Sequence, residues 1–341
     1  MTHQFDSGLF INSTLNKEWH GLGNIVAEPP KDTAEAMRLA GMDWKVEDSP
    51  VITYGDDDTA PSLVDGWKVL RRSDTKGILN VCRNSWTPLQ NSEAFSWFDP
   101  IIADGDAEIS AAVSLKGGKR IAITAKIKDG IEDVVQDDSI EAFLLLFNSH
   151  DGSLCLGFKF TNVRTVCANT LAQALHGEKV QATAHDLSWS GKIAKIRHTK
   201  SIFENMDAVR NAIDIQKRMF RYSIEEYRAM SKVDMSAGAF DRYLASVFAK
   251  QLAGSERTVR DLKQYEQLVQ NFEGGVGMDI KGVGRTMWGA YNAVTEWTTH
   301  QRTASNDTQD LESVRNRLDS LWFGTAAQVN DLAHKVALAT V

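Results

Sequence analysis

The chain is poor in cysteine, and this scarcity limits what kind of protein it can be. Its 341 residues include three cysteines, Cys82, Cys155 and Cys167, and none of them lies in a CxxC pair. They cannot build the disulfide framework of a small secreted domain, and isolated cysteines are typical of a reducing cytoplasm. No apolar run reaches the ~18 residues of a membrane span, and the N-terminus lacks the pattern of a secretion signal. We therefore expect a soluble, cytoplasmic protein without membrane contact.

Proline is absent from most of the chain. All six prolines lie between Pro29 and Pro100. Proline interrupts helices, so the first 100 residues favour strands and turns, whereas the remainder can form long helices. From Ser201 onward, apolar residues recur every three or four positions, as in amphipathic helices. The pattern predicts an α+β fold in two domains: a β-hairpin-rich antiparallel domain with packed helices over 1–200, and a mostly α-helical domain over 201–341.

Three hairpins are expected in the first domain, over 66–84, 107–127 and 139–163. The second contains Gly117-Gly118 between alternating apolar runs, which suits a two-residue type I′ turn. The segment 88–102 reads as one helix, and the segment that begins at Arg164 reads as the entry to another.

Charge is unevenly distributed, although the net charge is −7. Residues 1–140 carry 23 Asp and Glu against 14 Lys and Arg, a balance of −9. Basic residues nevertheless cluster at the expected hairpin tips and over 191–200, where a local groove could follow a phosphate backbone. Bases could stack on one of four aromatic residues in this half, namely Trp67, Trp86, Phe158 or Phe160. These candidate nucleic-acid-binding residues are Arg71, Arg72, Lys116, Lys119, Arg120, Arg164, Lys192, Lys195, Arg197, His198 and Lys200.

A second candidate site combines nucleophilic and acid–base residue types. His150, Asp151, Cys167 and Asn169 are the candidate catalytic residues, with Arg164 between them. Cysteine, histidine and an orienting amide are the components of a cysteine hydrolase. The alternative is structural: a turn histidine at one end of a strand and a buried cysteine at the other. We favour the structural reading.

No cofactor or metal is expected. The glycine-rich segment 273–286 lacks the GK[ST] ending of a P-loop and reads as a loop between helices. The histidines and cysteines lack the paired spacing of zinc ligands.

Eight blocks of sequence carry a family resemblance. They are WHGLG (19–23), WTPLQNSEAF (86–95), GGKRIAITAKI (117–127), NSHDGS (148–153), VRTVCANTL (163–171), IRHT (196–199), GRTMWGAYNAVTEW (284–297) and RLDSLWFG (317–324). Together they resemble an uncharacterised family of phage- and plasmid-encoded proteins, known mainly as a domain of unknown function. The hairpin-rich half is also similar, at the level of fold, to Rad52-like single-strand annealing proteins.

The resemblance implies a mobile-element accessory protein in the host cytoplasm. Our first hypothesis is therefore a homo-oligomer that binds single-stranded DNA and assists annealing, recombination or replication. The second is an enzyme that uses the His150–Asn169 cluster. The third is a host-interaction or counter-defence protein without nucleic-acid binding. The sequence does not decide whether the protein is an enzyme, but it favours a protein without catalytic activity.

Overall fold

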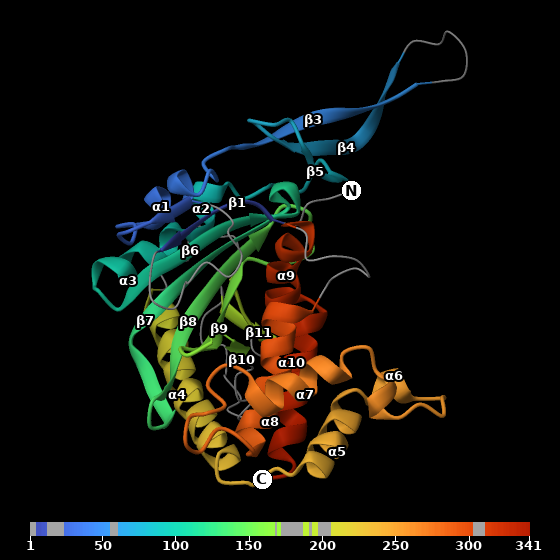
Figure 1. The fold of residues 1–341 in the computed structure, drawn as a ribbon. Helices are drawn as coiled ribbons and strands as arrows, with labels where there is room; N and C mark the ends of the chain where they lie inside the picture. Colours follow the sequence, from blue (N-terminus) through green and yellow to red (C-terminus); the bar gives the residue numbers. More distant parts are fainter. Residues whose placement is uncertain are drawn as a thin grey trace.

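The computed structural model describes residues 5–11, 24–54, 61–167, 169–171, 187–190, 193–196, 206–302 and 311–341. It has antiparallel sheets in the N-terminal half and helices in the C-terminal half, with 41% helix and 30% strand. The expected α+β class is confirmed. Figure 1 shows three parts: a large sheet, helices packed against it, and a small sheet that projects from one end.

The large sheet contains nine of the described strands in the order β11-β12-β9-β8-β7-β6-β1-β2, and β10 also pairs with β9. Its strands are β1 (Phe5–Ile11), β2 (Asn24–Val26), β6 (Ala107–Leu115), β7 (Arg120–Val135), β8 (Asp138–Ser149), β9 (Gly157–Arg164), β10 (Thr170–Leu171), β11 (Leu187–Ser190) and β12 (Ile193–Ile196). Neighbouring strands are antiparallel except β1 and β2, which are parallel. The hairpins expected at 107–127 and 139–163 therefore form its centre.

The small sheet is made by β3 (Val46–Thr53), β4 (Ser62–Arg72) and β5 (Ile78–Arg83), with β4 in the middle. We call it the arm, because it extends away from the body of the molecule (Figure 1). It contains the first expected hairpin, 66–84, as β4 and β5.

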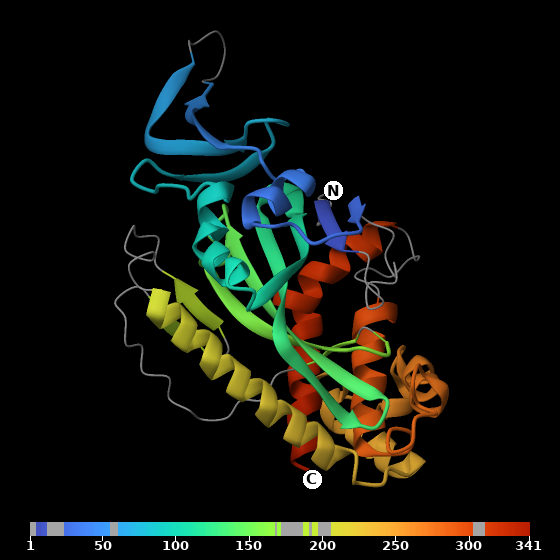
Figure 2. The ribbon, with the colours of Figure 1, turned by 90° about the vertical axis from the view of Figure 1, so that its left-hand side faces the viewer.

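The short helices near the arm are α1 (Thr33–Leu39), α2 (Asn91–Phe95), the 3₁₀ turn η1 (Ser96–Phe98) and α3 (Asp99–Ala103). The C-terminal helices are α4 (Met206–Met230), α5 (Ala237–Val247), α6 (Ala249–Leu252), the 3₁₀ turn η4 (Val259–Asp261), α7 (Tyr265–Gly274), α8 (Met287–Glu296), the π-helical turn η5 (Trp297–Gln301), α9 (Leu311–Phe323) and α10 (Thr325–Leu338). Figure 2 shows α4 on one side of the large sheet and the C-terminal helices beyond the sheet.

Both faces of the large sheet are buried, because alternate residues of its central strands enter different apolar clusters. Ile121 and Ile123 of β7 belong to the main core, which also contains residues of α1, α4, α5 and α8. Ala122, on the opposite face, packs in a second cluster with Leu321 and Trp322 of α9. The central strands consequently read as continuous apolar runs.

The main core contains residues from both predicted domains. Phe158 of β9 and Tyr227 of α4, for example, belong to the same cluster. The boundary at residue 200 lies outside the described residues and stays a prediction. No described helix combines the length and apolarity that crossing a bilayer requires.

A chain of contacts fixes the root of the arm to the body. The guanidinium of Arg72, at the end of β4, lies 4.5 Å from the centre of the Trp44 ring. Trp44 in turn meets His150 edge to face, with ring centres 5.5 Å apart. His150 Nε2 lies 2.8 Å from Asn91 Oδ1, and Asn91 Nδ2 donates to the carbonyl of Met42. These contacts hold the arm root in one place.

Three local expectations differ from the structure. The helix expected over 88–102 is divided into α2, η1 and α3, and Pro100 lies in the first turn of α3, where its missing N–H costs nothing. The loop between β6 and β7 has four residues, Lys116–Lys119, because Leu115 pairs with Arg120. The segment after Arg164 turns over 165–167 and returns as β10 beside β9, so its described part is a turn and a short strand and not a helix start.

Candidate functional site

His150 and Asp151 lie at the turn between β8 and β9. His150 is fully buried in the contacts that anchor the arm, and its backbone N–H donates to the carbonyl of Lys119. Asp151 Oδ1 accepts from the N–H of Ser153, which shapes the turn. Both residues therefore have structural partners at this end of the strand.

Cys167 and Asn169 lie beyond the opposite end of β9. The eight residues of β9 span roughly 25 Å at about 3.3 Å per residue, so the structure does not bring Cys167 and His150 together. Burial raises the pKa of the Cys167 thiol to about 11, although Arg164 opposes the shift. The thiol is therefore protonated at neutral pH, and a nucleophile would need the thiolate.

Arg164 is the centre of a buried polar cluster. Its side chain is fully buried, and its Nε donates to Asp138 Oδ1 at 2.6 Å. Its two terminal nitrogens donate to the carbonyls of Val276 at 3.0 Å and Gly277 at 3.3 Å. The second oxygen of Asp138 accepts from Trp288 Nε1 at 2.7 Å. The guanidinium thus joins β8 and β9 to the loop before α8, and no phosphate can reach it in this arrangement.

Two further ionisable residues adjoin this cluster, and sequence reasoning did not select them. His300 Nε2 lies 2.8 Å from the carbonyl oxygen of Cys167, and burial lowers the pKa of His300. Burial raises the pKa of Glu296, whose carboxyl accepts from the N–H of Val276. Both belong to the α8–η5 segment, more than 120 residues beyond Cys167 in the sequence, so no local spacing could reveal them. In the structure, the π-helical turn η5 marks this segment.

The structure gathers five of the basic candidates near the arm root. Gly118, in the β6–β7 turn, packs so closely that an added Cβ would lie 2.9 Å from Trp44 and 3.1 Å from Arg72. The turn therefore places Lys116, Lys119 and Arg120 beside the end of β4, which carries Arg71 and Arg72. We call this group of five the basic corner.

Most of the basic corner is already paired with carboxylates. Arg72 binds Asp74 through two nitrogens, at 2.9 and 2.7 Å. Lys116 and Arg120 share Asp319 of α9, while Arg71 shares Glu47 with Lys76. Lys119 has no ion pair with any described residue. Lys195 lies on β12 with its side chain undescribed, and Lys192, Arg197, His198 and Lys200 lie outside the described residues.

One face of the arm carries an aromatic–cation pair. Trp67 of β4 stands opposite Arg83 of β5, and the guanidinium lies 4.1 Å from the centre of the indole ring. Val69 and Val81 form the next registered pair on this face, followed by Arg71 and Ile78 beyond a register shift. Val81 and Ile78 are 51% and 62% exposed, so no described element covers them. We call these six residues the stacking face.

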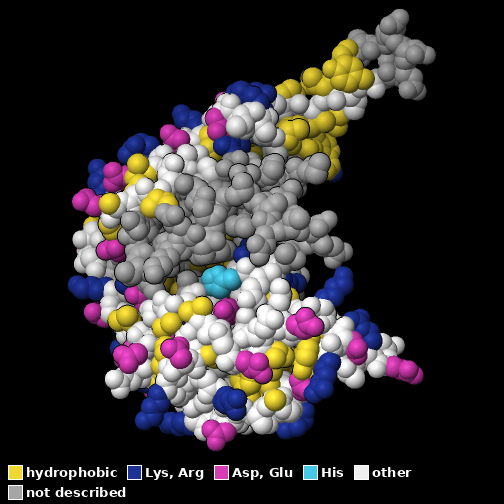
Figure 3. Space-filling model, viewed as in Figure 1, with side chains coloured by type: hydrophobic (Ala, Val, Ile, Leu, Met, Phe, Trp, Pro, Cys, Tyr) yellow, Lys and Arg dark blue, Asp and Glu magenta, His cyan; other side chains and the backbone are white. Residues whose placement is uncertain are grey.

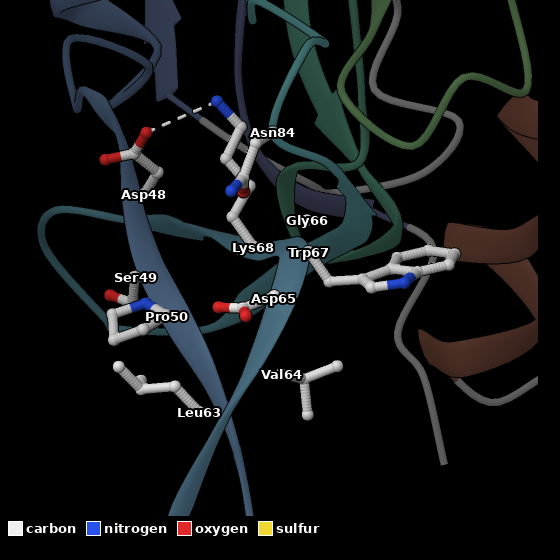
Figure 4. Close-up of a pocket in the computed structure, with 10 residues that line it drawn as sticks. All are labelled: Asp48, Ser49, Pro50, Leu63, Val64, Asp65, Gly66, Trp67, Lys68 and Asn84. Atoms are coloured by element: carbon white, nitrogen blue, oxygen red, sulfur yellow. Dashed lines mark hydrogen bonds and ion pairs between the residues drawn. The ribbon is translucent and has the colours of Figure 1, made fainter.

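A bulge in β4 produces a hollow beside this face. Four residues, 64–67, stand opposite the single residue Val51, because Lys68 pairs with Pro50 and Leu63 with Ile52. Gly66 allows the detour by adopting a φ of +80°. The hollow measures about 400 Å³, within the range of about 300–1,000 Å³ typical of small-ligand sites. Figure 4 shows Leu63 and Asp65 pointing toward β3, while Val64 and Trp67 point the other way.

The face of the molecule drawn in Figure 3 has no continuous basic patch among its described residues. In Figure 3, basic and acidic side chains are interspersed around the body, and apolar side chains gather along the arm. Any contact with a polyanion would therefore be local.

The fold and the buried cluster define the class of this protein. It is an α+β protein in which a polar cluster is buried between a large sheet and the α8–η5 segment. Residues 78–322 match the family described as Domain of unknown function (DUF932), and the chain belongs to that family. The match begins within β5, so β3 and β4 of the arm lie outside it. Neither the curated proteins nor the solved structures gave a match.

Proposed function

We propose that this protein is a phage- or plasmid-type accessory protein that binds single-stranded nucleic acid in the host cytoplasm and assists annealing, recombination or replication. The observation that carries the proposal is the Arg83–Trp67 pair on the stacking face. Single-strand-binding surfaces combine aromatic rings, on which bases stack, with cations that contact the backbone. An unpaired strand exposes both its bases and its phosphates to such a surface, whereas a duplex keeps its bases stacked inside.

The neighbouring basic corner extends the possible phosphate contacts. Glu47 is shared by Arg71 and Lys76, and Asp319 is shared by Lys116 and Arg120, so each carboxylate leaves one positive charge in excess. No described carboxylate pairs with Arg83 or Lys119. A nucleic-acid strand that stacks on Trp67 would therefore lie close to these positively charged side chains at the arm root.

Titration of a fluorescently labelled single-stranded oligonucleotide, followed by anisotropy at several salt concentrations, tests the proposal. Trp67→Ala should weaken binding by about 5- to 150-fold, since stacking of a base on an aromatic ring contributes about 1–3 kcal/mol. Arg83→Gln should weaken binding and reduce the slope of log K against log salt by about 0.7, the value for one phosphate contact on a single strand.

Lys250→Gln is the matched control, because Lys250 is exposed on α6, far from the arm (Figure 1). It removes the same charge as Arg83→Gln and should leave both affinity and slope nearly unchanged. Absence of binding by the unaltered protein at low salt, or equal effects of Arg83→Gln and Lys250→Gln, would reject the proposal.

A further inference from the structure

The outer part of the arm is apolar and exposed, unlike its root. Ile52 and Leu63 are a registered pair on one face and are 46% and 66% exposed. Tyr54 follows β3 directly and is 79% exposed. We call these three residues the arm tip. Exposed apolar side chains that adjoin one another on a projecting element are typical of protein–protein contacts.

The charge of this segment disfavours nucleic acid as the partner of the arm tip. From Ser49 to Trp67 the sequence contains four aspartates and no lysine or arginine. One of them, Asp65, points toward β3, as Leu63 does, and has no ion pair with any described residue (Figure 4). The complementary surface must therefore be basic as well as apolar.

The solvent-facing side of α4 carries an aromatic ring and more basic than acidic side chains, with Asp214 and Glu225 as its exposed carboxylates. Lys217, Arg218, Arg221 and Tyr222 share one side of the helix, since residues four positions apart are neighbours. Arg218 and Arg221 are exposed, and Tyr222 is 42% exposed. The opposite side of α4 is buried in the main core through residues such as Phe220 and Ile224. We call the four solvent-facing residues the α4 face.

Within one molecule, the arm tip and the α4 face cannot meet. Figures 1 and 2 both show the arm extending beyond one end of the body, while α4 runs along the body toward the other end. A contact between the two surfaces would therefore join different molecules.

We propose that the arm tip of one copy docks on the α4 face of the next. Ile52, Tyr54 and Leu63 would pack against Tyr222 and the aliphatic parts of the basic side chains, and Asp65 would pair with a cation of the α4 face. Because the two surfaces differ, the contact is head-to-tail and repeats from copy to copy, closing into a ring or continuing as a filament. This inference does not depend on nucleic-acid binding.

Two charge-introducing variants test the contact by sedimentation velocity. Leu63→Asp disables the arm tip, and Arg221→Asp disables the α4 face. Both side chains are exposed, so the fold should be retained. We expect the unaltered protein to form assemblies that shrink as salt rises, and each variant alone to be monomeric. Matched controls are Ile131→Asp, an exposed apolar position on β7, and Arg242→Asp, an exposed arginine on α5, and both should assemble like the unaltered protein.

An equimolar mixture of the two variants gives the decisive result. Each variant retains the surface that the other lacks, so a head-to-tail contact predicts a heterodimer that cannot grow further. Monomeric unaltered protein at tens of micromolar would overturn the proposal. So would normal assembly of Arg221→Asp, which would indicate an arm–arm contact or another acceptor, and so would a mixture that stays monomeric.

Discussion

Replacing Arg164 with leucine should destabilise the whole fold without selectively affecting ligand binding. The guanidinium is fully buried and makes four hydrogen bonds, to Asp138, to the carbonyls of Val276 and Gly277, and to the sulfur of Cys167. The leucine side chain fills part of the volume but leaves Asp138 buried with Trp288 as its remaining side-chain partner. An uncompensated buried carboxylate is among the most costly changes in a protein core.

The expected loss is about 3–5 kcal/mol of unfolding free energy, the usual result of removing one partner from a buried ion pair. Whole domains are stable by about 5–15 kcal/mol, so this loss should move the unfolding midpoint substantially. The unfolding free energy of Arg164→Lys should lie between those of the unaltered protein and Arg164→Leu. Lysine keeps the charge but cannot donate in the directions of the guanidinium fork.

Urea denaturation followed by tryptophan fluorescence provides the measurement, because Trp288 belongs to the cluster. The double variant Arg164→Leu/Asp138→Leu should recover part of the loss, since it removes the stranded charge together with its partner.

A loss below about 1 kcal/mol in Arg164→Leu would refute the structural role of this ion pair. If the same variant kept its stability and lost oligonucleotide binding, Arg164 would instead be a phosphate contact, as the sequence first suggested. The two roles therefore predict opposite combinations of stability and binding.

Three further perturbations follow from the structure. Asp319→Asn should lower the unfolding midpoint, because it leaves two cations at the sheet–α9 contact without their carboxylate; at low salt it should also strengthen oligonucleotide binding if the basic corner contacts phosphate. Cys167 has a folded-state pKa of about 11 against an ordinary 9.0, so the folded state holds a proton that the unfolded state loses. The contribution of Cys167 to the unfolding free energy should then be constant below about pH 9 and fall by up to about 1.4 kcal/mol per pH unit between about pH 9 and 11. Urea titrations at several pH values should show a weaker pH dependence for Cys167→Ala than for the unaltered protein. Asn91→Ala should cost about 1–3 kcal/mol in the same assay, since it leaves a buried histidine nitrogen and a buried carbonyl without their partner.

Each of these expectations has a contrary result. Unchanged oligonucleotide affinity in Asp319→Asn would separate the basic corner from nucleic acid. Rapid labelling of native Cys167 by a thiol reagent at pH 7 would contradict its raised pKa. An Asn91→Ala protein as stable as the parent would show that the arm root is held by its apolar contacts alone.

How much could be predicted from the sequence differs between local and distant relationships. The alternation over 107–127 and 139–163 predicted the central hairpins, because strand periodicity and turn residues act between neighbours in the chain. The helical period after Ser201 likewise predicted the C-terminal half. The turn between β6 and β7 was predicted to have two residues, Gly117 and Gly118, but it has four, Lys116–Lys119. The prediction was wrong because Gly118 must also pack against Trp44 and Arg72 of the arm root.

The role of the polar residues was decided by the tertiary structure. Cys167 and His150 are 17 positions apart and have the residue types of a cysteine hydrolase, but strand β9 separates them, as the structural reading of the sequence expected. Arg164 instead meets Asp138, 26 residues away, and Gly277, 113 residues away, while Asp138 binds a tryptophan 150 residues away. Nothing in the local pattern distinguishes a buried arginine from a surface one.

The sequence by itself determined the fold class, the hairpins and the helical half of this protein, because these follow from short-range periodicity and turn chemistry. The tertiary structure alone decided that Arg164 is part of the core, that the basic corner forms where two hairpins meet, and that the arm leaves apolar residues exposed. These outcomes depend on which distant segments bury one another, and burial determines whether a charged side chain serves the core or the surface.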